Sequence, residues 1–237
     1  MKRARIIPVL NLYEGMLHKT QRFKDPIYLG DPNIAVRIFN DLQVDELIII
    51  DYSNKEPNFE LMEDLASEAF MPMVYGGGIK TVGQFEKVIQ AGFEKVVLNT
   101  MPLESPSIVK ELSETFGSST LVASVDIKRN IFGKYNIFNR SSNSKLKKKD
   151  IRDYCSYLEN LGFGEILFNL VDKESFMQGP DIELAKIISK ETNIPTLYQG
   201  GIGSVDDIIH VLKESEISGV ACGAFFVLNG KFRTPLI

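Results

Sequence analysis

Residues 72–79 read Pro-Met-Val-Tyr-Gly-Gly-Gly-Ile, a short apolar run followed directly by three glycines. A stretch of the same design, Pro-Thr-Leu-Tyr-Gln-Gly-Gly-Ile, occupies residues 195–202, at an offset of 123 residues (195 − 72). An apolar run without polar alternation is typical of a parallel β-strand that is covered on both faces. Glycine after such a strand allows a tight turn into a helix. The two stretches therefore predict strand-to-helix units at matching places in two related halves of the chain.

Short β-rich runs of this kind alternate with longer amphipathic stretches along the whole chain. The predicted strands are residues 5–10, 46–51, 73–75, 95–99, 121–126, 165–170, 195–198 and 219–222. The predicted helices are residues 33–42, 58–69, 82–90, 106–116, 149–161, 181–190 and 205–214. Eight strands alternating with helices favour a closed (β/α)8 barrel of the α/β class over an open doubly wound sheet. Because 237 residues is the usual size of this fold, we expect one barrel domain over residues 1–237.

Two further pairs of segments support the two-fold repeat. Residues 45–48 resemble residues 164–167, and residues 6–11 resemble residues 121–126. The repeat places Asn11 across the barrel from Asp126, with both at C-terminal strand ends, where the active sites of barrel enzymes lie. Residues 131–138 alternate in character around a Gly-Lys turn, which predicts a small hairpin that could act as a lid over this mouth.

The composition argues against several classes of protein. With 44% hydrophobic residues, 24% charged residues and a net charge of −4, the chain has a large core and no reason to bind nucleic acid or an anionic membrane. Two cysteines cannot form a disulfide framework, and no signal peptide is visible, so we expect a reduced cytoplasmic protein. The longest apolar runs are too short to span a bilayer. We identify no metal-ligand cluster and expect no cofactor.

The glycines after two predicted strands are candidates for phosphate binding. Gly76, Gly77 and Gly78 follow one strand, and Gly200, Gly201 and Gly203 follow its repeat partner. Glycine lets the backbone approach a ligand closely, and the N–H groups at a helix start favour an anion. The alternative is a pair of tight turns without a ligand. Two such sites would suit a substrate that carries a phosphate at each end.

Three polar residues at predicted strand ends could take part in catalysis. Asp126, followed by Lys128 and Arg129, could be a general acid or base, or it could close the mouth through an ion pair. Asp51 could be a second such group, or it could accept hydrogen bonds from loop N–H groups. Asn11 can orient a substrate but cannot exchange a proton near neutral pH.

Four charged residues begin predicted strands and should converge at the opposite rim of the barrel: Arg5, Glu46, Lys95 and Glu165. Stability is the usual role of that rim. However, a desolvated ring of charges stabilises a fold inefficiently. The alternative is that the ring acts as a gate at this end of the barrel.

Together these features resemble the cyclase subunit of imidazole glycerol phosphate synthase, the ammonia-receiving half of a glutamine amidotransferase. The resemblance covers nearly the whole chain. It is carried by residues 5–7, 30–32, 45–47 with Asp51, 76–79, 95–96 with Asn99 and Thr100, 116–118, Asp126 with residues 128–129, and 164–167.

In that family a glutaminase subunit docks on the barrel bottom, and ammonia travels through the barrel to the far mouth. The resemblance implies that the four charged residues form the gate at the ammonia entrance and that Asp126 is one of two catalytic carboxylates. It also implies phosphate-binding roles: one phosphate at Gly78, Asn99 and Thr100, and the other at a site that includes Gly201 and Gly223. Lys19 matches the mobile lysine of the family, in a flexible loop after the first strand.

The sequence departs from the family pattern at three places. The other catalytic aspartate, at the end of the first strand, is replaced by Asn11. An Asp-Gly-Thr phosphate loop after the sixth strand reads Glu174-Ser175-Phe176, which loses the glycine and should crowd the turn. A serine in the last phosphate loop is replaced by Gly223.

An intact entrance with an altered exit resembles the divergent branch of the family encoded with surface-polysaccharide genes. There, the barrel and its glutaminase supply ammonia to a third protein, which converts an acetamido sugar into an acetamidino sugar. The resemblance implies the same role here, with a phosphorylated small molecule or a nucleotide sugar as substrate. The main alternative is a working cyclase, a lyase of histidine biosynthesis. A different phosphosugar enzyme or a purely structural subunit are further alternatives.

Overall fold

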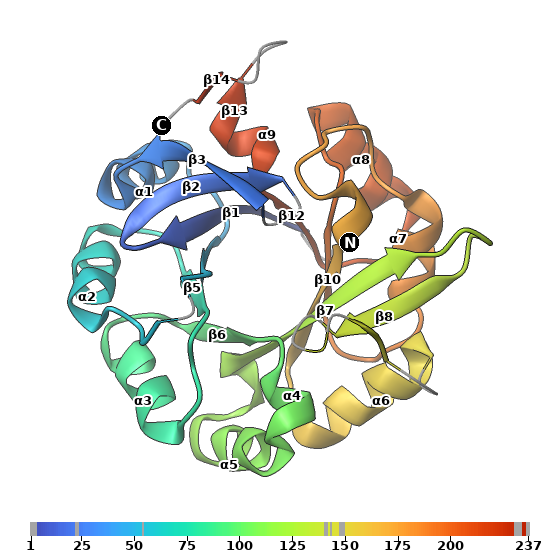
Figure 1. Cartoon of the computed structure of the whole chain (residues 1–237), viewed down its shortest axis with the longest axis horizontal. Coiled ribbons are helices and arrows are strands. Elements are labelled where there is room, and N and C mark those ends of the chain that lie inside the picture. Colours follow the sequence, from blue (N-terminus) through green and yellow to red (C-terminus); the bar gives the residue numbers. More distant parts are fainter. Residues whose placement is uncertain are drawn as a thin grey trace.

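The computed structural model describes residues 4–21, 24–53, 55–139, 142, 144–146, 150–229 and 234–235. Eight parallel strands close into a barrel, because β7 pairs with β10 and β12 pairs with β1 (Figure 1). In barrel order the strands are β1 (Arg5–Tyr13), β4 (Leu47–Asp51), β5 (Met73–Gly76), β6 (Lys95–Leu98), β7 (Leu121–Arg129), β10 (Glu165–Leu170), β11 (Thr196–Gln199) and β12 (Gly219–Cys222). The predicted (β/α)8 barrel is confirmed. The two-fold repeat stays a prediction.

Helices surround the barrel, as Figure 1 shows. The seven predicted helices are present: α1 (Pro32–Asp41), α2 (Phe59–Glu68), α3 (Val82–Gln90), α5 (Pro106–Phe116), α6 (Ile151–Leu161), α7 (Ile182–Ile188) and α8 (Val205–Glu214). Several begin at a side-chain cap. For example, Asp31 accepts a hydrogen bond from the Asn33 N–H, and Thr81 accepts one from the Gln84 N–H. The sequence analysis missed α4 (Met101–Glu104) and α9 (Ala224–Val227), which are too short for a helical period to be recognised.

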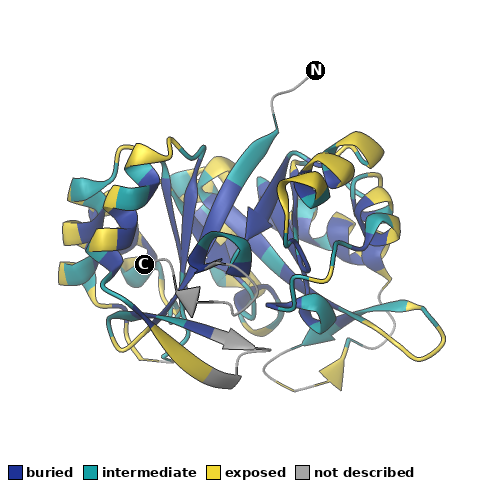
Figure 2. Cartoon of the chain, turned by 90° about the horizontal axis from the view of Figure 1, so that it is seen from above, coloured by how far each residue is buried: buried dark blue, intermediate teal, exposed yellow. Residues whose placement is uncertain are grey.

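Two separate cores hold the barrel together, and Figure 2 shows the strands as its buried centre. One core lies between the strands and the helices. The other lies in the barrel interior and consists of Ile7, Val9, Ile48, Val74, Val97, Val122, Leu167, Leu197 and Ala221, with Ile50 packed against it. Each of the eight strands contributes to this second core. Aliphatic side chains therefore surround the axis of the barrel.

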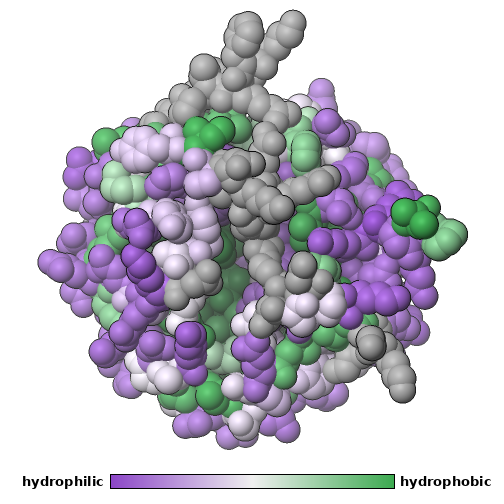
Figure 3. All heavy atoms as spheres, viewed as in Figure 1, coloured by the Kyte–Doolittle hydropathy of each residue, from purple (hydrophilic) through white to green (hydrophobic). Residues whose placement is uncertain are grey.

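Two hairpin arms extend from the barrel. A hairpin is present near the predicted place but begins earlier than predicted, because the end of β7 (Ile127–Arg129) pairs with β8 (Tyr135–Asn139) and residues 131–134 lie in the turn. β8 also pairs with β9 (Ser144–Lys145). The sequence analysis missed the other arm, in which β1 continues into β2 (Met16–Gln21) and β3 (Lys24–Gly30). On the face drawn in Figure 3, apolar residues gather in the central hollow inside a largely hydrophilic rim.

After β12 the chain forms α9 and a short pairing of β13 (Leu228–Asn229) with β14 (Thr234–Pro235). Both cysteines, Cys155 and Cys222, are buried free thiols. Within the described part of the chain, no helix is long and apolar enough to cross a membrane.

Candidate functional site

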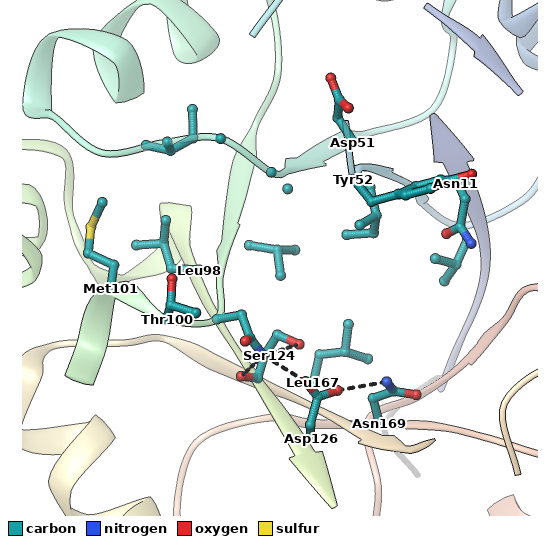
Figure 4. Close-up of a pocket in the computed structure, with 18 of the residues that line it drawn as sticks. Asn11, Asp51, Tyr52, Leu98, Thr100, Met101, Ser124, Asp126, Leu167 and Asn169 are labelled. Carbon is teal, nitrogen blue, oxygen red and sulfur yellow. Dashed lines mark hydrogen bonds between the residues drawn. The ribbon is translucent and has the colours of Figure 1, made fainter. Parts of the chain in front are cut away.

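A cavity of about 230 Å³ lies at the C-terminal ends of the barrel strands (Figure 4). It gathers eight of the residues that the sequence analysis singled out: Asn11, Asp51, Gly76, Gly77, Gly78, Asn99, Thr100 and Asp126. Figure 4 shows Thr100 and Met101 on the opposite side of this cavity from Asn11. We call it the mouth cavity.

Asp126 is held by two amide side chains. Asn169 Nδ2 donates to Asp126 Oδ1 at 2.8 Å, and Asn99 Nδ2 donates to Asp126 Oδ2 at 3.3 Å. The neighbouring cations are engaged elsewhere: Lys128 Nζ lies over the Phe138 ring, and Arg129 donates to Glu183 at 3.1 Å. The two amides hold the Asp126 carboxylate in place at the mouth cavity, where it could act as a base or stabilise a positive charge.

Asp51 has structural partners at the end of β4. Its Oδ1 accepts from the Ser53 N–H at 2.9 Å, and its Oδ2 accepts from Tyr75 Oη at 3.4 Å. Burial raises the pKa of Tyr75, and the Asp51 charge raises it further. Asp51 therefore accepts a loop N–H, as one of the two sequence interpretations expected, while still lining the mouth cavity.

The glycine loop after β5 needs glycine on steric grounds. Gly77 has φ +123°, and a Cβ there would lie 2.0 Å from the Asp51 carbonyl oxygen. Gly78 has φ +67°, and a Cβ there would lie 2.5 Å from the Lys55 carbonyl oxygen. Gly77 and Gly78 are therefore explained by the close packing of this loop against the backbone at Asp51 and Lys55. An anion at this loop remains a proposal.

Thr100 lines the mouth cavity together with this loop. It is the N-cap of α4, but its side chain makes no capping hydrogen bond. We expect inorganic phosphate to bind near Gly78, Asn99 and Thr100. Thr100→Val, which keeps the shape and removes the hydroxyl, should weaken phosphate binding about tenfold, because a hydrogen bond to a charged group is lost. Crystals soaked in phosphate and a titration of both proteins would measure this.

The second predicted phosphate site is a separate and nearly filled pocket. Gly201 and Gly223 line a space of only about 20 Å³, together with Lys19 and Glu174. We expect phosphate to occupy this pocket far less than the mouth cavity. Equal occupancy of the two sites in the soaked crystals would show that the altered loop still binds phosphate.

Lys19 fills this second pocket, and the expectation of a flexible loop is wrong. Lys19 lies within β2 and is 6% exposed, and its Nζ lies 2.9 Å from where a Cβ of Gly223 would be. Burial lowers its pKa, and the charge of Glu174 opposes that shift. The segment is a strand because the Glu14-Gly15 turn, with Gly15 at φ +82°, folds it back on β1.

The Glu174-Ser175-Phe176 turn has the backbone geometry that a glycine would favour. Ser175 has φ +66° and Met177 has φ +53°, and both residues lie in the left-handed region that costs a non-glycine residue about 1–2 kcal/mol. The predicted crowding of this turn agrees with these angles. Glu174 and Ser175 are both buried.

At the opposite end of the barrel, the four charged residues form the predicted ring. Lys95 Nζ contacts Glu46 Oε1 at 2.9 Å and Glu165 Oε2 at 3.1 Å, and Arg5 pairs with the same two carboxylates. Both glutamates are buried. Burial opposes the charge of Arg5, but pairing with Glu165 and Glu46 outweighs burial and raises its pKa. The ring closes the end of the apolar barrel interior.

The sequence analysis missed several polar residues of the mouth cavity, among them Tyr52 and Asn169. Three buried atoms in this cavity have no hydrogen-bond partner among the described residues, namely Asn11 Nδ2, Tyr52 Oη and Asn169 Oδ1. An unpaired buried polar atom costs about 1–3 kcal/mol. The sequence could have indicated Asn169, because every second side chain of a strand faces the same way. Glu165 and Leu167 of the same strand face the barrel axis, so Asn169 should face it too.

The fold and the site define an α/β-barrel protein with a charged ring at one end and a glycine-lined polar cavity at the other. The chain belongs to the family described as "Histidine biosynthesis protein", which it matches over residues 5–233. Within this family the chain is HisF-like, as the names of its relatives indicate.

Three relatives show this. The chain is 39% identical to "Putative imidazole glycerol phosphate synthase subunit hisF2" of Pseudomonas aeruginosa, covering 100% of this chain and 96% of the relative. It is 38% identical to "Putative imidazole glycerol phosphate synthase subunit hisF3" of Vibrio vulnificus, with 100% and 93% covered. It is 31% identical to "Imidazole glycerol phosphate synthase subunit HisF" of Alkaliphilus metalliredigens, with 97% and 92% covered.

Proposed function

We propose that this HisF-like chain receives ammonia from a glutaminase subunit and delivers it through the barrel for the amidation of an acetamido sugar. The observation that carries the proposal is the contrast between the two ends of the barrel. The entrance keeps the complete ring of Arg5, Glu46, Lys95 and Glu165. The exit has Asn11 where a second titratable group would be needed for cyclase chemistry.

The apolar interior between the two ends suits ammonia. Ammonia is small and neutral, whereas ammonium in an aliphatic channel would carry a large desolvation cost. A channel that excludes water also keeps ammonia from being protonated or lost. The ring would seal the entrance against water until a glutaminase docks on that face.

At the exit, ammonia nitrogen would replace the carbonyl oxygen of the acetamido group, and that oxygen would leave the sugar. A third protein would activate the carbonyl with a nucleoside triphosphate, because an amide does not react with ammonia unaided. The carbonyl oxygen would first take a phosphoryl or adenylyl group. Ammonia would then attack the carbon and give up its extra protons, and the oxygen would leave as phosphate or as a nucleoside monophosphate. In this scheme Asp51 and Asp126 orient groups at the exit, and Gly78, Asn99 and Thr100 bind a phosphate of the sugar substrate.

The alternative is a working cyclase of histidine biosynthesis. It is supported by the names of the relatives and by Asp126, which lines the mouth cavity with Asn99 and Thr100. A cyclase would then have to carry out, with Asp126 alone, the proton transfers that would otherwise be shared by two carboxylates.

A gene deletion in the organism that encodes the chain separates these functions. We expect the deletion strain to grow without added histidine and to lose the acetamidino sugar from its surface polysaccharide, as measured by mass spectrometry of the released sugars. A strain that needs histidine and keeps its polysaccharide unchanged would refute the amidation proposal and support the cyclase.

A further inference from the structure

The buried polar atoms of the mouth cavity that lack hydrogen-bond partners among the described residues indicate which chemical group could bind there. Asn169 has a fixed orientation, because its Nδ2 donates to Asp126 and its Oδ1 must therefore face elsewhere as an acceptor. Asn11 Nδ2 and Tyr52 Oη are donors without a partner in the described part of the chain. In Figure 4 Tyr52 extends toward Asn11, and both residues line the mouth cavity.

Charged groups fit this set of atoms poorly. A carboxylate or phosphate has no proton for Asn169 Oδ1 and would lie near the Asp126 carboxylate. An ammonium group has no acceptor for Asn11 Nδ2. A secondary amide fits, because its carbonyl oxygen accepts and its N–H donates from the same planar group.

We propose that Asn11, Tyr52 and Asn169 form an amide subsite that binds the acetamido group of the substrate, an inference that rests on the proposed function. Asn11 Nδ2 and Tyr52 Oη donate to the acetamido carbonyl oxygen, and Asn169 Oδ1 accepts from the acetamido N–H. Asn11 and Asn169 are 6% and 5% exposed, so a ligand that pairs them does so away from bulk water. In this subsite Asn11 is a specificity residue.

The floor of the cavity supports this orientation. Val9, Ile50 and Leu167 line the mouth cavity and are also part of the apolar barrel interior or packed against it. The acetyl methyl group can pack against these side chains. The acetamido carbon is then held directly above the end of the channel from which ammonia would emerge.

The test compares two sugar phosphates that differ at one position. N-acetylglucosamine 1-phosphate carries an acetamido group where glucose 1-phosphate carries a hydroxyl. We expect the purified chain to bind the first about tenfold more tightly, measured as the ratio of the two Kd values by calorimetry or NMR titration. Asn11→Leu, of similar size but without the amide, should reduce this ratio to about one.

Thr100→Val is the matched control, because Thr100 lies on the opposite side of the cavity from Asn11. It should weaken both ligands alike and keep their ratio. If Asn11→Leu does not fold, Tyr52→Phe serves instead and should reduce the ratio about threefold. Equal affinity of the native chain for the two ligands, or an unchanged ratio in the folded variants, would overturn the amide subsite. This measurement needs no glutaminase and no gene deletion, so it can fail while ammonia delivery stands, and the reverse.

Discussion

Asn11→Asp is expected to raise the cyclase turnover of this chain about 100-fold, when the substrate of imidazole glycerol phosphate synthase and ammonium are supplied. The native chain should turn over very slowly, because only Asp126 of the two opposed positions can transfer a proton. The substitution puts a titratable group across the cavity from Asp126. Steady-state kinetics at saturating ammonium measure the change.

The environment of Asn11 gives this variant a pH dependence. A carboxylate at this buried site would be desolvated, so its pKa would rise above the unfolded value of about 4. Because the folded-state pKa is the higher one, the variant should lose stability as the pH rises above about 4 and through the folded pKa. Thermal unfolding between pH 4 and pH 8 checks the sign against the native chain.

Asp126→Asn provides the control, since it should abolish the gain in the Asn11→Asp background. Two results would contradict the reasoning. Near-normal cyclase turnover by the native chain would refute the amidation proposal. A folded Asn11→Asp variant without any gain would show that phosphate binding, or the shape of the cavity, also blocks the cyclase reaction.

Lys95→Met should lower the free energy of unfolding by about 3 kcal/mol and uncouple glutamine hydrolysis from product formation. Lys95 Nζ bridges Glu46 and Glu165, so its loss leaves two buried carboxylates with Arg5 as their cationic partner in the ring. If the ring is the gate, ammonia then escapes at the entrance. The ratio of glutamate to amidated product, measured with the glutaminase well below the melting temperature, should rise severalfold.

Arg37→Met is the matched control. Arg37 pairs with Glu68 on the surface, where both side chains are exposed, and such a pair contributes at most about 1 kcal/mol. It should leave both stability and coupling nearly unchanged. Reduced stability of Lys95→Met with normal coupling would show that the ring is only a stabiliser, and a chain that binds no glutaminase would exclude a gate.

The amino-acid sequence by itself determined the barrel and its charged ring. Apolar runs and amphipathic stretches differ in periodicity, and that difference is local, so the strands and the seven longer helices could be predicted within a few residues. The ring could be predicted for a related reason. Charges that begin parallel strands of a closed barrel must meet at one rim, whatever the details of packing.

Side-chain direction and the path of the arms were decided only by the tertiary structure. Lys19 was expected in a flexible loop, but pairing of β2 with β1 and β3 turns it into the pocket that was predicted for the second phosphate. Tyr52 joined the mouth cavity through the turn after β4, which no local pattern of the chain specifies. Alternation along β10 indicates which way Asn169 faces, but only the pairing of β10 with β7 places it beside Asp126. Register depends on contacts between residues far apart in sequence, and a shift of one residue reverses which side chains face the barrel axis. For that reason the sequence could identify the two ends of the barrel, whereas the polar atoms that meet at its mouth required the folded chain.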